Sequence, residues 1–259
     1  MTPRPPEVPT WMARGEHELP PDRAWLSARE EERAAELRFT KRSAEYLLRR
    51  WVCKHTVAEA LGLPVGVRSL ARVEVTNLPS GAPLVRLDEE PVELEVSLTD
   101  RAGWAVCVLG PAGNPLGCDL ELVEPRTAGF VSDFLTEEEQ AYVASRPSAD
   151  RGAAANLVWS AKESALKVLR LGLREDTRNV EVVLGAGDVA SSSGWAALEV
   201  RAAAGSTMRG WWRREGVFVV TVLAERVVPQ PEALTGSADL ATARPLHSWL
   251  HRPLSPGAP

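Results

Sequence analysis

The chain has 259 residues, of which 44% are hydrophobic and 25% are charged, and this composition is typical of a globular protein. Its formal net charge of −5 argues against a general grip on nucleic acid by a basic surface. No apolar run approaches the roughly 18 residues of a membrane helix, and residues 1–10 lack the apolar segment of a signal peptide. We therefore expect a cytoplasmic protein that contacts neither nucleic acid nor a membrane.

The first half of the chain combines two predicted helices with a group of strands. Ser27 is the expected N-cap of a helix over 27–37, and Glu30, three residues later, completes a capping box. A second helix is predicted over 41–61, where apolar side chains recur at helical spacing until Gly62. The strand-like stretches that follow are ARVEVT, LVRL, VELEVSL, GWAVCVL and PLGCDLEL.

The second half repeats this order. The segment 134–145 is predicted to be helical, with Thr136 as its N-cap, and a longer helix over 150–171 ends at Gly172. The strands that follow are NVEVVLG, GWAALEVRA, TMRGWWRR and GVFVVTVLAE. Helices followed by strands, twice over, predict an α+β fold with two similar lobes in tandem.

The composition also suggests where the lobes end. We expect an N-terminal lobe over 1–112 and a C-terminal lobe over 113–226. The remainder, 227–259, is rich in proline, alanine and serine, and we expect a mobile tail with little fixed structure there.

The three cysteines are Cys53, Cys107 and Cys118. They are odd in number, show no CxxC spacing, and each lies among apolar neighbours. Buried thiols are therefore expected, rather than a zinc site or a disulfide framework.

Two acids one residue apart stand out in LGCDLELVEP, residues 116–125. Because successive side chains of a strand point to opposite faces, Asp119 and Glu121 point the same way. Like charges on one face repel, so the pair lies either at a solvated edge or around a divalent cation. Their oxygens are hard ligands that suit Mg²⁺ or Mn²⁺, and the apolar strand before the pair argues for an internal position.

A second charged group lies on the predicted helix with the sequence NLVWSAKESALKVLRLGL, residues 156–173. Trp159, Glu163 and Lys167 are spaced by four, so they line one face, and Lys162 lies beside them. The plainer interpretation is an amphipathic helix whose Glu–Lys pair contributes about 0.2–0.5 kcal/mol.

Taken together, GCDLE (117–121) and WSAKESALK (159–167) resemble the two signature blocks of the 4′-phosphopantetheinyl transferases. The resemblance is to the larger, single-chain, surfactin-synthetase-activating type. The stretch LRFTKRSAEYLLRRWVCKHTVAEALGL is similar to the N-terminal helical part of that family. The likeness extends over approximately residues 25–225.

The resemblance implies a fold of two similar α+β lobes, related by a pseudo-twofold axis, with the active site in the cleft between them. It also implies a monomer. The implied activity is transfer of the 4′-phosphopantetheine arm of coenzyme A to a serine of an acyl or peptidyl carrier protein, with release of 3′,5′-ADP. Such carriers serve fatty acid, polyketide and nonribosomal peptide synthesis.

Roles for individual residues also follow from the resemblance. Asp119, Glu121 and Glu163 would hold Mg²⁺, or Mn²⁺ in its place, against the diphosphate. Glu163 would in addition be the general base toward the carrier serine, directly or through a water, and Lys167 would stabilise charge on the transferred phosphate. Lys162 would either bind phosphate or face solvent, and Trp159 is expected to pack rather than to contact substrate.

Contacts to the nucleotide are the part of the site where this chain departs from the family. Lys54 matches a basic position of the N-terminal helix, although it could also belong to a solvated face. Asp100 stands where the family has a histidine that touches the 3′-phosphate, and Arg101 beside it could take over. In the family's Gly-Lys-Pro stretch only Gly81 and Pro83 are kept, so a phosphate-binding lysine is missing.

Three functions are compatible with this pattern. The intact acids and Lys167 favour a working transferase. The changed phosphate contacts leave open a catalytically silent protein that docks carrier domains, or a transferase whose donor lacks the 3′-phosphate. Some basic residues should steer the acidic carrier, and apolar side chains near 130–135 are expected to contact it.

Overall fold

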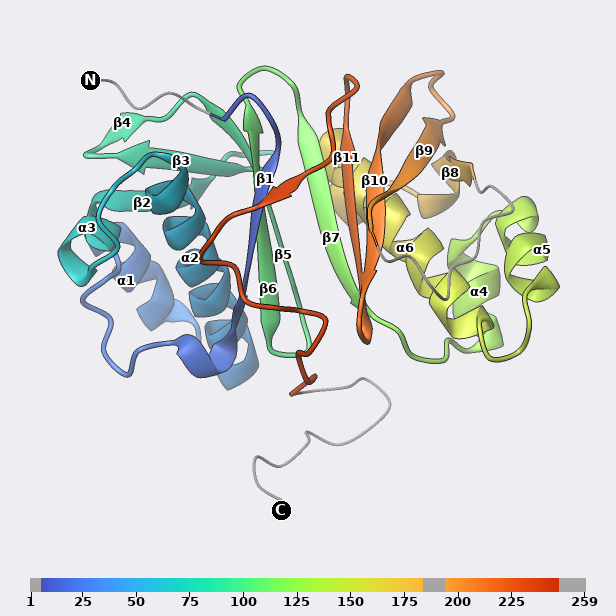
Figure 1. The fold of residues 1–259 in the computed structure, drawn as a ribbon, viewed down its shortest axis with the longest axis horizontal. Coiled ribbons are helices and arrows are strands. Elements are labelled where there is room, and N and C mark those ends of the chain that lie inside the picture. The colour runs from blue at the N-terminus through green and yellow to red at the C-terminus, as the bar shows by residue number, and fades with distance from the viewer. Residues whose placement is uncertain (1–5, 184–193, 247–259) are drawn as a thin grey trace, which may run out of the picture. The chain divides into compact units, whose positions relative to one another are not determined.

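The chain divides into two compact units in a computed structural model that describes residues 6–183 and 194–246 (Figure 1). The units are Met1–Asn114 with Pro231–Asp239, and Pro115–Gln230 with Leu240–Pro259. The division after Asn114 lies two residues beyond the predicted end of the first lobe. Each unit is built from strands and helices, so the predicted α+β class is confirmed.

The first unit contains a four-stranded and a three-stranded sheet. Its strands are β1 (Thr10–Gly15), β2 (Val73–Asn77), β3 (Pro83–Leu87), β4 (Glu90–Pro91), β5 (Leu94–Arg101), β6 (Trp104–Pro111) and β12 (Glu232–Ala233). Its helices are α1 (Ala28–Glu36), α2 (Thr40–Ala60) and α3 (Val67–Arg72), with a 3-10 turn η1 (Glu16–Glu18). The strand orders are β12-β1-β6-β5 and β2-β3-β4, and α2 packs against β6 and β1. Because β6 is buried along nearly its whole length, its sequence is an unbroken apolar run.

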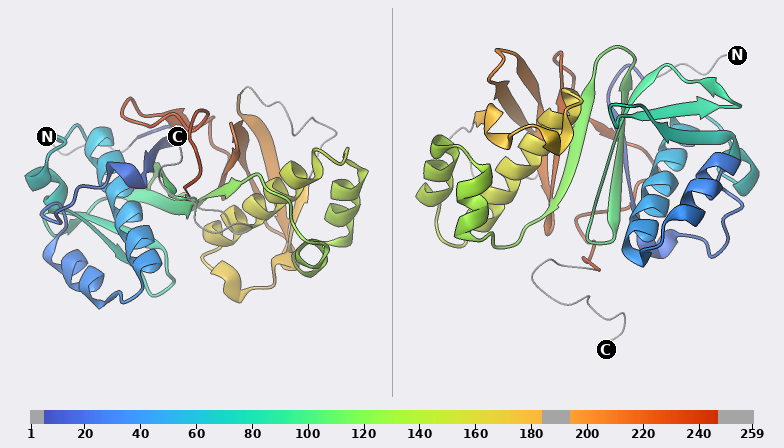
Figure 2. Two further views of the ribbon diagram at one scale, coloured as in Figure 1. Left: turned by 90° about the horizontal axis from the view of Figure 1, so that it is seen from below. Right: turned by 180° about the vertical axis from the view of Figure 1, so that it is seen from behind.

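The second unit contains one antiparallel sheet of five strands. Its strands are β7 (Leu116–Leu122), β8 (Val180–Val183), β9 (Ala196–Ala202), β10 (Thr207–Glu215) and β11 (Phe218–Ala224). Its helices are α4 (Ala128–Phe134), α5 (Glu137–Ser145) and α6 (Arg151–Val168), with 3-10 turns η2 (Gly172–Arg174) and η3 (Thr177–Asn179). The strand order is β7-β11-β10-β9-β8. Figures 1 and 2 show α6 running along one face of this sheet, where it packs against β7 and β11.

The two units share one layout. In the first, β1, β6 and β5 are adjacent, β3 packs beside β5, and β2 follows. In the second unit the spatial order is β7, β11, β10, β9 and β8, and these strands correspond in turn to β1, β6, β5, β3 and β2. Each unit also has a short helix that begins with a capping box, at Ser27 in α1 and at Thr136 in α5, and both N-caps are those predicted. The repeated order seen in the sequence therefore corresponds to a repeated local architecture.

One short helix of the second unit, α4, was not predicted. The predicted helix in the segment 134–145 corresponds to α5, which begins at Glu137, and only Phe134 of that segment belongs to α4. Thr136 accepts a hydrogen bond from the Glu139 amide as the N-cap of α5. The capping signal therefore placed the start of α5 correctly.

The expectation of a tail without fixed structure is wrong for residues 227–246. The short strand β12 pairs in parallel with β1, and the Oγ of Ser237 accepts a hydrogen bond of 3.0 Å from the amide of Ala13. Val228 and Leu240 are buried. The composition of proline, alanine and serine did not indicate these contacts, because the segment is held by backbone pairing and by only two buried apolar side chains. Residues 247–259, also predicted to be mobile, lie outside the described residues.

Two smaller expectations can be compared with the structure. Cys53, Cys107 and Cys118 are buried thiols, as predicted. Among the described residues, no helix combines the length and the apolar character needed to cross a bilayer.

Candidate active site in the second unit

Strand β7 directs both acids of the DxE pair toward α6. Gly117, Asp119 and Glu121 share one face of the strand, and a Cβ placed on Gly117 would lie only 2.0 Å from the carbonyl oxygen of Ser164. Asp119 is 3% exposed and Glu121 is 7% exposed, so the alternative of a solvated edge is excluded. Two buried acids on one face require positive partners.

Helix α6 is held close to the sheet by a cluster of buried hydroxyl groups. The Oγ1 of Thr221 lies 2.9 Å from Ser160 Oγ and 2.7 Å from Ser164 Oγ, and it donates to the Ser160 carbonyl at 3.0 Å. Thr221 belongs to β11 and lies directly opposite Asp119 in the strand pairing. Together with the missing side chain of Gly117, these hydrogen bonds fix the position of the helix beside the acids.

Lys167 joins the helix to the first acid. Its Nζ donates to Asp119 Oδ1 at 2.9 Å and to the Cys118 carbonyl at 2.8 Å, and it lies 3.9 Å from Glu163 Oε2. Burial by itself lowers the pKa of this ammonium, but the negative charges of Asp119 and Glu163 outweigh it and raise the pKa. The structure thus brings together three residues that the sequence predicted for one site.

Glu121 has a partner that the sequence analysis missed. Arg126 donates from Nη2 to Glu121 Oε2 at 2.8 Å and from Nε to Asn156 Oδ1 at 2.7 Å. Its guanidinium also lies over the ring of Phe130, 4.5 Å from the centroid. The only signal in the sequence was an arginine five residues after an acid expected to be internal.

Trp159 packs in an aromatic cluster, in agreement with the expected structural role. Its ring is 5.1 Å from those of both Phe130 and Phe134, in edge-to-face geometry, and the residue is buried. This cluster secures α4 against α6.

The donor set suits a hard divalent cation. Asp119, Glu121 and Glu163 offer carboxylate oxygens, and one positive charge, the ammonium of Lys167, already lies between the first and the third of them. Within the described residues no three such groups are arranged to hold a metal ion, and Asp119 and Glu121 are paired with Lys167 and Arg126. The residues fit a Mg²⁺ site in their chemistry, and occupation would require the cation to compete with these partners.

Lys162 does not take either of its two predicted roles. Its side chain is fully buried, and its Nζ lies 2.8 Å from Glu139 Oε2 while donating to the carbonyls of Thr177 and Val180 at 2.9 and 2.6 Å. Burial lowers its pKa, partly offset by the charge of Glu139. Lys162 therefore neither binds phosphate nor faces solvent, because its ammonium is fully engaged in the ion pair and the two hydrogen bonds that connect α6 with the neighbouring segments.

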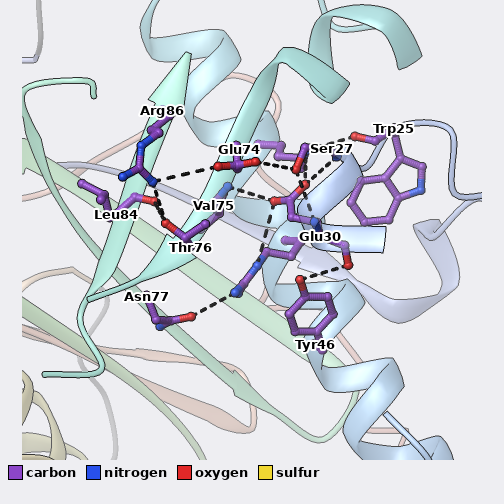
Figure 3. Close-up of polar contacts among 12 residues, drawn as sticks. Trp25, Ser27, Glu30, Tyr46, Glu74, Val75, Thr76, Asn77, Leu84 and Arg86 are labelled. Atoms are coloured by element: carbon purple, nitrogen blue, oxygen red, sulfur yellow. Dashed lines mark hydrogen bonds and ion pairs between the residues drawn. The ribbon is translucent and has the colours of Figure 1, made fainter. Parts of the chain in front are cut away.

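Lys54 in the first unit also differs from its predicted role. It too is fully buried, with its Nζ 2.6 Å from Glu30 Oε2 and donating to the carbonyls of Trp25 and Leu70 at 3.1 and 2.9 Å. Figure 3 shows Glu30 among its polar contacts, beside Ser27, Trp25 and Val75. The predicted contact of Lys54 with coenzyme A is excluded, because all its hydrogen-bonding capacity is used inside the unit.

The same arrangement of contacts thus occurs once in each unit. A capping-box glutamate pairs with a buried lysine of the long helix and accepts a bond from a strand amide through its other oxygen. In the first unit Glu30 pairs with Lys54, and the backbone amide of Val75 donates to Glu30 Oε1 at 2.9 Å. In the second unit Glu139 pairs with Lys162, and the backbone amide of Val182 donates to Glu139 Oε1 at 2.8 Å. Both lysines are therefore parts of the scaffold.

Apart from Lys167, the remaining predicted contacts to coenzyme A belong to the first unit. Asp100, near the end of β5, forms an ion pair with Arg49 of α2. Arg101 ends β5, Gly81 has a φ of +93° in the turn between β2 and β3, and Pro83 begins β3. The positive φ explains the glycine at that turn. Their contact with coenzyme A stays a prediction.

Comparison with known proteins relates this chain to a family model and to a curated protein. The sequence model of the 4′-phosphopantetheinyl transferase superfamily matches residues 115–205. A holo-[acyl-carrier-protein] synthase from Marinomonas sp. (strain MWYL1) is 33% identical over 88 residues, which cover 31% of this chain and 69% of that protein. The family match spans Asp119, Glu121, Glu163 and Lys167.

Proposed function

The chain belongs to the 4′-phosphopantetheinyl transferase superfamily, and we propose that its donor is coenzyme A and its acceptor a serine of an acyl or peptidyl carrier protein. As a member it is an enzyme that transfers phosphopantetheinyl groups to carrier proteins. The second product would be 3′,5′-ADP. The observation that carries the proposal is the contact of Lys167 with both Asp119 and Glu163 inside the matched segment.

The proposed metal ligands are Asp119, Glu121 and Glu163, with Mg²⁺ or Mn²⁺ as the ion. When bound, the ion supplies positive charge to the diphosphate oxygens. Support comes from the shared face of β7 and from the ammonium of Lys167, which already lies between two of the three carboxylates.

Glu163 is the proposed general base toward the carrier serine. Its side chain is 22% exposed, compared with 5% for Asp119, so it is the carboxylate of the two that an incoming hydroxyl reaches. Lys167 is 29% exposed and is oriented by the Cys118 carbonyl. We propose that its ammonium stabilises negative charge on the phosphate being transferred.

The proposed contacts to coenzyme A are Arg101, Asp100, Gly81 and Pro83, together with Lys167. Arg49 compensates the charge of Asp100, which lowers the repulsion that this acid would exert on a phosphate. A donor without the 3′-phosphate is the second candidate, favoured by the buried position of Lys54. The surfactin-synthetase-activating subtype, a monomeric state and a cytoplasmic location stay predictions.

The test is transfer of the arm in a defined mixture. The protein is incubated with coenzyme A, Mg²⁺ and several apo carrier proteins, and each carrier is weighed by mass spectrometry. We expect a mass gain of one phosphopantetheine arm, abolished by Glu163→Gln and by chelation of the metal. No gain with any carrier would contradict the proposal, and a fully active Glu163→Gln variant would remove Glu163 as the base.

A further inference from the structure

Arg126 is held in one conformation from three directions. Glu121 Oε2 and Asn156 Oδ1 accept its hydrogen bonds at 2.8 and 2.7 Å, and the ring of Phe130 lies beneath its guanidinium. Its side chain is only 13% exposed. A surface arginine that paired with Glu121 by chance would not be fixed in this way.

The anchor at Asn156 cannot be reversed by turning its amide. The residue is fully buried, and its Nδ2 donates to the carbonyls of Glu124 and Gly152, both at 2.7 Å. Its Oδ1 must therefore face Arg126, because a guanidinium only donates. The positive charge of Arg126 is consequently fixed beside Glu121.

We infer that Arg126 competes with the divalent cation for Glu121 and thereby weakens the binding of metal to the free enzyme. The inference rests on the proposed metal ligands Asp119, Glu121 and Glu163. A cation must share the Glu121 carboxylate with a guanidinium that Asn156 and Phe130 hold beside it, and two positive charges near one carboxylate repel. Without metal, the same guanidinium compensates a carboxylate that is largely buried.

Removing the charge should therefore have opposite effects on the two states. The metal-free protein loses a compensating partner of Glu121, whereas the metal-bound protein has the cation in its place. By linkage, metal affinity rises as the stability of the metal-free protein falls. Arg126 thus sets how strongly the site holds a cation before the anionic diphosphate arrives.

The test measures binding of Mn²⁺ alone by calorimetry, at constant ionic strength. We expect Arg126→Gln to bind Mn²⁺ about tenfold more tightly than the natural chain. Arg126→Lys keeps the charge and should bind it as the natural chain does. Arg178→Gln removes the same charge from an exposed pair with Asp176 in the same unit, and should also leave the affinity unchanged.

Thermal unfolding with and without Mn²⁺ provides a second measurement that does not depend on activity. Without metal, Arg126→Gln should have a lower melting temperature than the natural chain. Addition of Mn²⁺ should raise the melting temperature of Arg126→Gln by more than that of the natural chain. Equal affinity in Arg126→Gln and the natural chain overturns the inference, and weaker affinity shows that Arg126 orients Glu121 as a ligand. If the natural chain itself binds no Mn²⁺, the metal site and this inference both fail, whereas arm transfer tests the proposed function separately.

Discussion

Arg49 of α2 and Asp100 of β5 form an ion pair inside the first unit. Asp100 is the acid that stands where related transferases are expected to have a phosphate-binding histidine. Its partner changes the meaning of that substitution, because the carboxylate does not act on an approaching phosphate alone. The ion pair also neutralises the positive charge that Arg49 would otherwise present at this position.

Asp100→Asn should strengthen the binding of coenzyme A by releasing the guanidinium of Arg49. A partly exposed pair of this kind is worth about 1 kcal/mol, so we expect a roughly fivefold lower KM for coenzyme A. The KM for 3′-dephospho-coenzyme A should not change. Asp88→Asn is the matched control, because it removes an acid from the exposed pair with Arg72 in the same unit. An equal change for both donors would show that Asp100 does not act at the 3′-phosphate.

Lys162→Met should destabilise the protein rather than weaken its grip on coenzyme A. The substitution leaves Glu139 buried without its ion pair, at a cost of about 3–5 kcal/mol, measured by chemical denaturation. Adding Glu139→Gln should recover part of this loss. The lysine would be a phosphate ligand after all if Lys162→Met kept full stability and raised the KM for coenzyme A.

Gly117→Ala should displace α6 from β7. The new Cβ would lie 2.0 Å from the Ser164 carbonyl oxygen and 3.0 Å from Lys167 Cβ, and overpacking of this kind costs about 1–3 kcal/mol. We expect a lower melting temperature and a loss of transfer activity. Gly129→Ala is the control, because its Cβ would meet nothing closer than 3.9 Å. Natural stability and activity in Gly117→Ala would mean that the close contact is not needed.

A chain that ends at residue 230 should lose stability in the first unit. The deleted segment donates three backbone hydrogen bonds, to the carbonyls of Pro9, Trp11 and Ala13 at 2.8, 2.9 and 3.0 Å. At about 0.5–1.5 kcal/mol each, their loss costs roughly 2–4 kcal/mol and exposes the edge of β1 to association. A chain that ends at residue 246 keeps these bonds and should melt at a higher temperature than the chain that ends at residue 230. Equal melting of both shortened chains would contradict the prediction.

Local patterns predicted much of the site. Alternation along a strand placed Asp119 and Glu121 on one face, and helical spacing placed Glu163 beside Lys167. The capping boxes at Ser27 and Thr136 are equally local, since cap and partner are three residues apart. These features depend on geometry repeated within one element, so a reader of the sequence can derive them.

Assignments that depended on the partner of a charge were less secure. The resemblance suggested Lys54 as a contact of coenzyme A and left Lys162 open between a phosphate contact and a solvent-exposed position. Each instead reaches a glutamate on another helix, and both ion pairs are buried. The sequence contains both members of each pair but gives no indication that they meet.

The α+β class, the principal helices and strands, and the resemblance to the transferase family could all be predicted from the amino-acid sequence, because they follow from periodicity, capping and short motifs. The tertiary structure decided which charges are compensated: Arg49 by Asp100, Glu121 by Arg126, and Lys162 by Glu139. It also decided that the segment after Val227 pairs with β1 through β12 and buries Val228 and Leu240. The physical reason is the same in each case, since burial makes the energy of a charge or a backbone amide depend on partners brought together only by folding.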